Sequence, residues 1–184
     1  MDTYQASGQG DPWYDHLGIT SNGIVAHNGG NSIAGPVAAL PGSGNIENNQ
    51  EYHLLVTYDA PTQVMRVFWN CVERLSAVVD IASYTGTSTV RWGFTAATGG
   101  ANNEHRVCNA SWTVVEDVVP PNASVCHGES VELTLSDYAL NPTWSPGIGL
   151  SSTTGNTVIA TLDASQTYTV TYEDACANES TLQV

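Results

Sequence analysis

Two aspartates and one histidine near the start of the chain have the types and spacing to bind a divalent cation. Asp2 and Asp11 are nine residues apart, and His16 follows five residues later. Calcium prefers carboxylate oxygens, whereas a neutral imidazole suits a neighbouring transition metal. The intervening segment 5–10 is small and contains glycine, so the chain can fold back there and bring both carboxylates to one ion. The pattern predicts a metal-binding loop, with a solvated acidic turn as the alternative.

The elements that must position these side chains are predicted to be β-strands. Alternating or β-branched runs occur at 54–58, 64–69, 90–95, 107–115, 131–135, 157–162 and 167–172. Turns that contain glycine, asparagine or proline separate these runs. No window sustains a helical period, although 76–83 could form a short helical turn. The sequence therefore predicts an all-β protein.

A proline pair divides the chain into two predicted domains. Pro120 and Pro121 cannot donate ladder hydrogen bonds, and consecutive prolines stiffen a short linker. We expect a first domain over 1–117, a linker over 118–122 and a second domain over 123–184.

The four cysteines fall two to each predicted domain. The simplest of the three possible connectivities is one bridge per domain, Cys71 with Cys108 and Cys126 with Cys176. Zinc bound by cysteine is not favoured, because the sequence has no Cys-x-x-Cys or Cys-x-x-His pair.

The charge balance of the chain excludes two classes of partner. Its 184 residues include 18 acidic side chains but only 4 arginines and no lysine, which gives a formal net charge of −14. Such a surface repels the phosphates of nucleic acids and anionic membranes. No apolar run approaches the roughly 18 residues that would suggest a membrane span. Few charges, with abundant serine, threonine, asparagine and glycine, are typical of secreted all-β modules.

Two blocks of the sequence resemble L-type (legume-like) lectins. Residues 2–19 (DTYQASGQGDPWYDHLGI) resemble their metal-binding strand and loop without a gap, and residues 90–103 (VRWGFTAATGGANN) resemble a strand and its sugar-contacting loop. Segments 45–59 and 65–69 look like consecutive strands between these blocks. The sequence of these blocks is most similar to bacterial members of the family, which occur in secreted or cell-surface proteins. The resemblance covers about 1–117 and implies a concanavalin-like jelly-roll β-sandwich whose N-terminal strands are missing from this chain.

The resemblance also implies roles for individual residues. Calcium and a second ion, Mn²⁺ or another transition metal, would share Asp2 and Asp11, with the Tyr4 carbonyl on calcium and His16 on the second ion. Backbone N–H groups of the sugar loop would contact a glycan; they belong to Gly99, Gly100, Ala101 and Asn102. Trp13 would stack on a sugar ring or, equally, pack under the loop. Trp92 and Phe94 are expected in the core.

The metal motif departs from the family at Ala6. This residue stands where the family has an asparagine that binds both calcium and sugar, and the family's upstream glutamate and sugar-binding aspartate are not in this sequence. The missing N-terminal part, or neighbouring domains, would be a partner of this segment.

The second predicted domain resembles the immunoglobulin-like or PKD-like repeats of secreted Bacteroidetes-type proteins. Residues 124–133, 143–150 and 167–171 carry this resemblance, which implies a small β-sandwich. Trp144 would then be the core tryptophan, near a Cys126–Cys176 bridge.

Two functions remain after catalysis is set aside. Glycosidases of related fold present paired carboxylates on one strand, but the strand at 1–6 has no second carboxylate at that spacing. The sequence therefore predicts a calcium-dependent carbohydrate-binding module, not an enzyme, that serves adhesion or polysaccharide binding. The alternative is a non-binding structural segment, a degenerate lectin fold and spacer in a large adhesin or filament.

Overall fold

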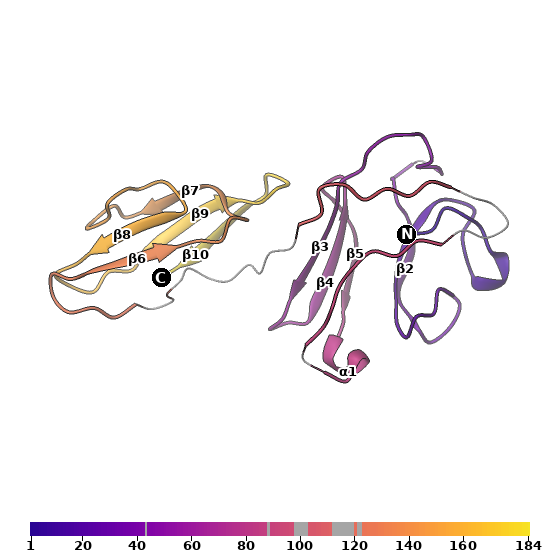
Figure 1. The fold of residues 1–184 in the computed structure, drawn as a ribbon, viewed down its shortest axis with the longest axis horizontal. Coiled ribbons are helices and arrows are strands. Elements are labelled where there is room, and N and C mark those ends of the chain that lie inside the picture. The colour runs from indigo at the N-terminus through magenta and orange to yellow at the C-terminus, as the bar shows by residue number, and fades with distance from the viewer. Residues whose placement is uncertain (43, 88, 98–102, 112–119, 121–122) are drawn as a thin grey trace. The chain divides into compact units, whose positions relative to one another are not determined.

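The computed structural model describes residues 1–42, 44–87, 89–97, 103–111, 120 and 123–184. The chain forms two compact units, Met1–Arg106 and Val107–Val184, which we call the first and the second unit. Strands make up most of the regular structure (Figure 1), and the helical segments described are η1 (Ser7–Gln9) and α1 (Ile81–Thr85). The all-β prediction is confirmed. The predicted linker 118–122 lies outside the described residues except at Pro120.

The first unit contains a hairpin and a three-stranded meander. β1 (His16–Thr20) pairs antiparallel with β2 (Ser32–Ala38), and β3 (Leu54–Asp59), β4 (Val64–Trp69) and β5 (Val72–Val78) form an antiparallel sheet in that order. Between β4 and β5, Asn70 and Cys71 have φ angles of 49° and 62°. Two consecutive positive φ values are what a type I′ turn requires, and this turn matches the twist of the strands that it joins.

The core of the first unit lies between these two sheets. Its buried side chains come from both of them and from the segment that connects them: Leu17, Ala39, Ile46, Val67, Trp69 and Leu75. Tyr52 stacks on Trp69 with 5.3 Å between ring centroids. Arg74 on β5 donates two hydrogen bonds, of 3.0 and 2.6 Å, to the carbonyl oxygen of Ala38. The β1–β2 hairpin is therefore held against β5 by both apolar packing and a charged donor.

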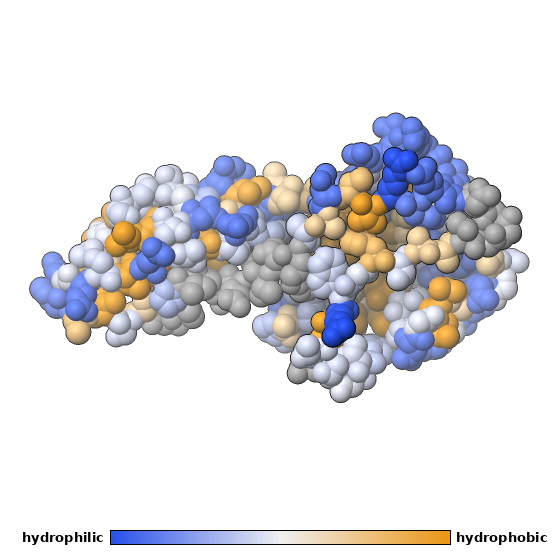
Figure 2. All heavy atoms as spheres, viewed as in Figure 1, coloured by the Kyte–Doolittle hydropathy of each residue, from blue (hydrophilic) through white to orange (hydrophobic). Residues whose placement is uncertain are grey.

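Hydrophobic side chains also reach the surface of both units between hydrophilic ones (Figure 2). On edge strand β3, Leu54 and Val56 are 42% and 50% exposed, although they pair directly with the buried Trp69 and Val67 of β4. Side chains directly opposite each other lie on the same face of a sheet. The core-facing side of this sheet is therefore covered over β4 but open along β3.

The second unit is built from two small antiparallel sheets. One pairs β6 (Ser130–Thr134) with β8 (Thr157–Thr161), and the other has the order β10 (Glu179–Gln183), β9 (Thr169–Glu173), β7 (Leu140–Ser145). Burial alternates along β8 and β9, so each presents one face to a common core. Trp144 is 3% exposed in that core, as predicted, and its Nε1–H donates to the carbonyl oxygen of Gly155 at 2.9 Å.

Several local predictions are wrong. Residues 90–95 form no strand, and Trp92 and Phe94 are 50% and 55% exposed and contact each other edge to face. The short helical turn expected around 76–83 is present but lies later in the chain: β5 extends to Val78, and α1 covers Ile81–Thr85 after the Asp80 cap. The alternating pattern of 90–95 does not form a strand, because this segment pairs with no strand among the described residues.

The predicted cysteine pairing is also wrong. Cys108 and Cys126 are exposed free thiols, so the bridges Cys71–Cys108 and Cys126–Cys176 are not formed, whereas Cys71 and Cys176 are disulfide-bonded. Cys108 follows a described segment without strands, and nothing in the spacing of cysteines along a chain specifies which of them meet.

No helix among the residues described above is long and apolar enough to cross a membrane.

Candidate functional site

The predicted metal loop folds back on itself through a short 3-10 turn. After η1, Gly10 adopts a left-handed conformation with φ 80°, and its N–H bonds to the carbonyl of Ser7. A Cβ on Gly10 would meet Cβ of Asn28 at 2.9 Å, so only glycine fits this turn. The turn places Asp11 in the interior, where its Oδ2 accepts a hydrogen bond from the N–H of Ala6 at 3.0 Å.

His16 begins strand β1 and is 1% exposed. Its backbone exchanges two hydrogen bonds with Asp2, Asp2 N–H to His16 O at 2.9 Å and His16 N–H to Asp2 O at 2.8 Å. The ring Nδ1 lies 3.2 Å from the carbonyl oxygen of Tyr14. A carbonyl only accepts, so Nδ1 carries a proton in this contact and Nε2 is left to face the interior.

The loop between β1 and β2 brings a second histidine to this point. The N–H of His27 donates to the carbonyl of Gln9 at 2.7 Å, and the side-chain amide of Asn28 donates to Gly8 at 3.1 Å. These bonds attach the loop to η1. Gly18 makes room for the imidazole, because a Cβ at that position would collide with Cε1 of His27.

Three buried donors therefore converge, and we call them the donor set: Asp11 Oδ1, His16 Nε2 and His27 Nε2. The two nitrogens are 3.1 Å apart, and the carboxylate oxygen is 3.7 Å from the first and 3.9 Å from the second. The three side chains are 3%, 1% and 7% exposed. Asp11 Oδ1 is buried without a hydrogen-bond partner. Burying such an oxygen is costly, and a cation at this point would remove the cost.

Burial shifts the pKa of His27 in the donor set and of Asp15 beside it. It lowers the pKa of His27 below its usual 6.5, and the neighbouring His16 lowers it further, against the opposing effect of Asp11. The neutral ring that results keeps a lone pair available for a metal. Burial also raises the pKa of the Asp15 carboxyl above 3.8, opposed by the hydrogen bond from the N–H of Ile46.

The structure brings together only part of the predicted metal site. Asp11 and His16 belong to the donor set. Asp2 lines a small cavity of about 100 Å³ together with His16 and His27, but its Oδ1 accepts a hydrogen bond from the N–H of Tyr4 at 2.9 Å. Tyr4 itself is 63% exposed.

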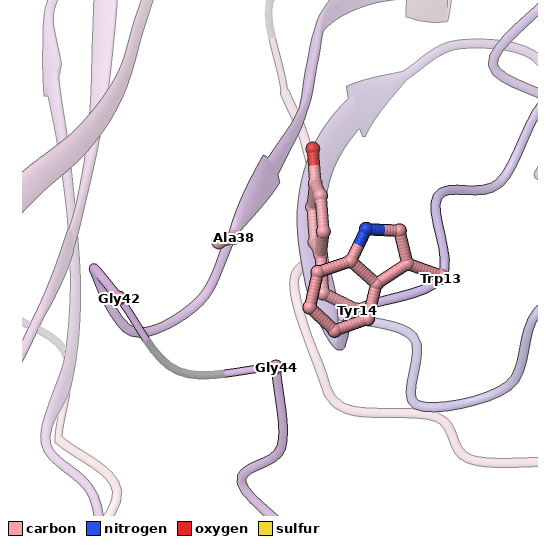
Figure 3. Close-up of a pocket in the computed structure, with 5 residues that line it drawn as sticks. All are labelled: Trp13, Tyr14, Ala38, Gly42 and Gly44. Carbon is pink, nitrogen blue, oxygen red and sulfur yellow. The ribbon is translucent and has the colours of Figure 1, made fainter.

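A second pocket lies beside this loop and contains a predicted sugar-binding residue. Trp13 is 75% exposed and meets Tyr14 edge to face, with 5.5 Å between ring centroids. Figure 3 shows both rings on one side of a pocket of about 220 Å³, opposite Ala38, Gly42 and Gly44. A Cβ on Gly44 would meet the Trp13 ring at 2.5 Å, so glycine permits this close approach.

The predicted sugar loop, with Gly99, Gly100, Ala101 and Asn102, lies outside the described residues. Its neighbour Asn103 is described and donates from its side-chain amide to Oε1 of Glu47 at 2.7 Å. Glu47 follows Ile46, whose N–H donates to Asp15. Asn103 is therefore hydrogen-bonded to a residue three positions beyond Gly44, which lines the Trp13 pocket.

His27 is the site residue that the sequence analysis missed. It lies eleven residues beyond His16, in a loop rich in asparagine and glycine, and no regular spacing links it to the metal motif. Gly18 could have indicated it, because a glycine directly after the buried start of β1 leaves room for another side chain beside His16.

Comparison with known proteins places these features in a family context. Residues 1–125 match the family model described as the legume lectin domain. No solved structure gives a significant match to the chain.

Proposed function

Because the chain belongs to the legume lectin domain family, we propose that its first unit binds carbohydrate with the help of a divalent cation. Legume lectin domains are carbohydrate-binding and not catalytic, in agreement with the sequence analysis. The observation that carries the proposal is an exposed aromatic side chain, Trp13, two residues from Asp11 of the buried donor set. One short loop thus connects a cation site with a surface for a sugar ring.

The residues fit a divalent ion. A buried carboxylate oxygen without a hydrogen bond lies near two imidazole nitrogens, which is the environment that a cation stabilises. Calcium would need additional oxygens, which Asp2 and the Tyr4 carbonyl could supply, and Mn²⁺ or another transition metal would use His16. The ion performs no chemistry in this proposal. It orders the loop before the glycan arrives, which lowers the entropy cost of binding.

The glycan would contact the loop through stacking and hydrogen bonds. The indole of Trp13 offers a flat apolar face, and sugar rings carry apolar C–H faces that pack on such surfaces. Backbone N–H groups at 99–102 would bind hydroxyl groups. The described residue Asn103 supports this part of the proposal, because it is hydrogen-bonded to Glu47, three residues beyond Gly44 of the Trp13 pocket.

We also propose a setting for this activity. The second unit would act as an immunoglobulin-like or PKD-like spacer in a secreted or cell-surface bacterial protein, where the lectin serves adhesion or polysaccharide binding. Its two small sheets around Trp144 support that assignment. The open core-facing edge at Leu54 and Val56 would pack against further strands or a neighbouring domain.

The second candidate function is a structural segment that binds no sugar. Ala6 favours it, because this residue contributes only its backbone N–H to Asp11 and has no side-chain oxygen for an ion or a sugar. In that case the ion, if bound, would only stabilise the fold.

A glycan-binding measurement with matched tryptophan variants separates the two functions. We expect immobilised glycans to capture the metal-loaded protein and EDTA to release it. Trp13→Ala should weaken binding about tenfold or more, since exposed aromatic anchors dominate such contacts. Trp92→Ala removes another half-exposed tryptophan of the first unit and should leave binding unchanged. Failure of the folded, metal-loaded protein to bind any glycan would favour the structural function.

A further inference from the structure

We propose that His27 is a direct metal ligand, so that Asp11, His16 and His27 form a site selective for Zn²⁺ or a similar nitrogen-preferring ion. This inference rests on the proposed function, because it concerns the cation that would order the sugar-binding loop. It identifies the ion class from the donor set itself.

The distances within the donor set fit a single ion. Nitrogen and oxygen ligands lie about 2.0–2.2 Å from zinc, so two ligands of the same ion are at most about 4.3 Å apart. All three separations, 3.1, 3.7 and 3.9 Å, are below this limit. One ion can therefore contact the three atoms without movement of the backbone.

A hydrogen bond between the histidines is a poorer account of the same geometry. One Nε2–H could donate to the other Nε2 across 3.1 Å, but Asp11 Oδ1 would then stay buried without a partner. Asp11 Oδ1 also lies too far from either ring, at 3.7 and 3.9 Å, for a hydrogen bond. A cation among the three atoms satisfies all of them together.

The chemistry of the donors determines which ion binds. Two imidazoles and one carboxylate suit Zn²⁺, Ni²⁺ or Cu²⁺, whereas Mn²⁺ and Ca²⁺ prefer sites dominated by oxygen. Without His27, the remaining pair of Asp11 and His16 would be less selective. The second imidazole is therefore the residue that sets ion preference in this chain.

Isothermal titration with Zn²⁺ and with Mn²⁺ tests the proposal on the full chain. The thiols of Cys108 and Cys126 are alkylated first, because free exposed thiols also bind zinc. The wild type should bind Zn²⁺ more tightly than Mn²⁺. His27→Gln should lower Zn²⁺ affinity at least roughly tenfold, since even outer-shell partners of a metal site are worth that much. Its effect on Mn²⁺ affinity should be smaller, and the exposed-site control His105→Gln should change neither.

Two further measurements keep the test decisive. Co²⁺ replaces zinc as a spectroscopic probe, and its visible absorption should change in His27→Gln but not in His105→Gln. If His27→Gln does not fold, Gly18→Ala provides the same test, because its Cβ would displace the His27 ring while leaving the imidazole in the chain. We expect Gly18→Ala to lose Zn²⁺ preference as well.

The outcomes distinguish this inference from the proposed function. Wild-type Zn²⁺ affinity in His27→Gln, with loss of binding in His16→Gln, would show that His27 only contacts His16. Equal affinity of the wild type for Zn²⁺ and Mn²⁺ would also overturn the inference. A protein that binds Zn²⁺ through His27 but captures no glycan would retain the inference and refute the lectin activity.

Discussion

Asp15 organises the predicted metal loop although it does not belong to the donor set. Its side chain is buried, and its Oδ2 accepts a 2.6 Å hydrogen bond from the N–H of Ile46. Its backbone N–H bonds to Gly44 and its carbonyl oxygen to the N–H of Ala39, at 3.0 Å each. One residue thereby fixes the loop of Trp13 against the opposite wall of the Trp13 pocket.

Replacement of Asp15 should therefore lower the stability of the first unit. Asp15→Ala leaves the Ile46 N–H buried without an acceptor, which costs about 1–3 kcal/mol. Asp15→Asn keeps an oxygen acceptor and should cost less. Urea denaturation of both variants measures the difference, with the exposed Glu51→Ala as control. Equal stability of Asp15→Ala and Asp15→Asn would mean that this hydrogen bond contributes nothing.

At the scale of elements, the β1–β2 hairpin depends on one glycine. Gly35 has φ 87° in β2, and a Cβ there would meet the carbonyl oxygen of Leu17 at 2.7 Å. The pairing register shifts between Leu17 and Ile19, so β2 contains a bulge opposite Gly18. The bulge lies next to the opening into which the His27 ring fits.

Gly35→Ala should destabilise the hairpin by more than about 1 kcal/mol, because it combines an unfavourable φ with a backbone collision. Gly29→Ala is the matched control, since a Cβ at that loop glycine would have nothing within 4 Å. Thermal melts of the two variants without metal give the comparison. A Gly35→Ala melt that coincides with that of Gly29→Ala would contradict this account of the bulge.

Strands with strong local patterns were predictable, and strands that depend on distant partners were not. The runs 54–58, 64–69, 131–135, 157–162 and 167–172 correspond to β3, β4, β6, β8 and β9 within two residues at each end. β2 has no comparable pattern, because it contains glycine and proline and gains its order from β1 and Arg74. Conversely, 90–95 has the right composition but pairs with no strand among the described residues.

At the scale of the whole molecule, we expect acid to destabilise the second unit and metal ions to stabilise the first unit. Asp174 in the second unit is partly desolvated, which raises its pKa, but hydrogen bonds from Asn178, from the N–H of Cys176 and from the Tyr138 hydroxyl outweigh this and lower it below 3.8. Burial, with Asp174 nearby, raises the pKa of Tyr138 to about 12, so its hydroxyl remains a donor at neutral pH.

The second unit should lose stability in acid. A carboxylate whose pKa is lower in the folded state stabilises the fold above its unfolded pKa, and this contribution disappears as pH falls through the folded pKa. We therefore expect stability to fall below about pH 4. Asp174→Asn should flatten that dependence, and the exposed Asp137→Asn should not. The stability of the second unit is measured between pH 2 and 6 by hydrogen exchange of the β9 amides in both variants. An unchanged profile in Asp174→Asn would refute it.

Metal binding should stabilise the first unit only. An ion at a hundred times its Kd adds about 2.7 kcal/mol to the folded state that binds it. Hydrogen exchange with Zn²⁺ or with EDTA should therefore differ in peptides that cover 11–27 and not in those that cover 130–183. No difference in either region, or an equal difference in both, would be inconsistent with a site built from Asp11, His16 and His27.

The fold class, the lectin family and two members of the donor set were predictable from the sequence alone. Those properties are written in local patterns: strand periodicity, turn residues and the contiguous motif that contains Asp11 and His16. The jelly-roll lectin sandwich that this motif predicted is confirmed by the all-β fold and the family match.

The surroundings of that motif depend on the tertiary structure. It brought His27 to Asp11 and His16 through a backbone hydrogen bond to Gln9 of η1, exposed Trp13 over Gly44, and left Cys108 and Cys126 unpaired. Each of these depends on contacts between residues far apart in the chain. Local patterns do not encode such contacts, because they form only when separate elements pack together.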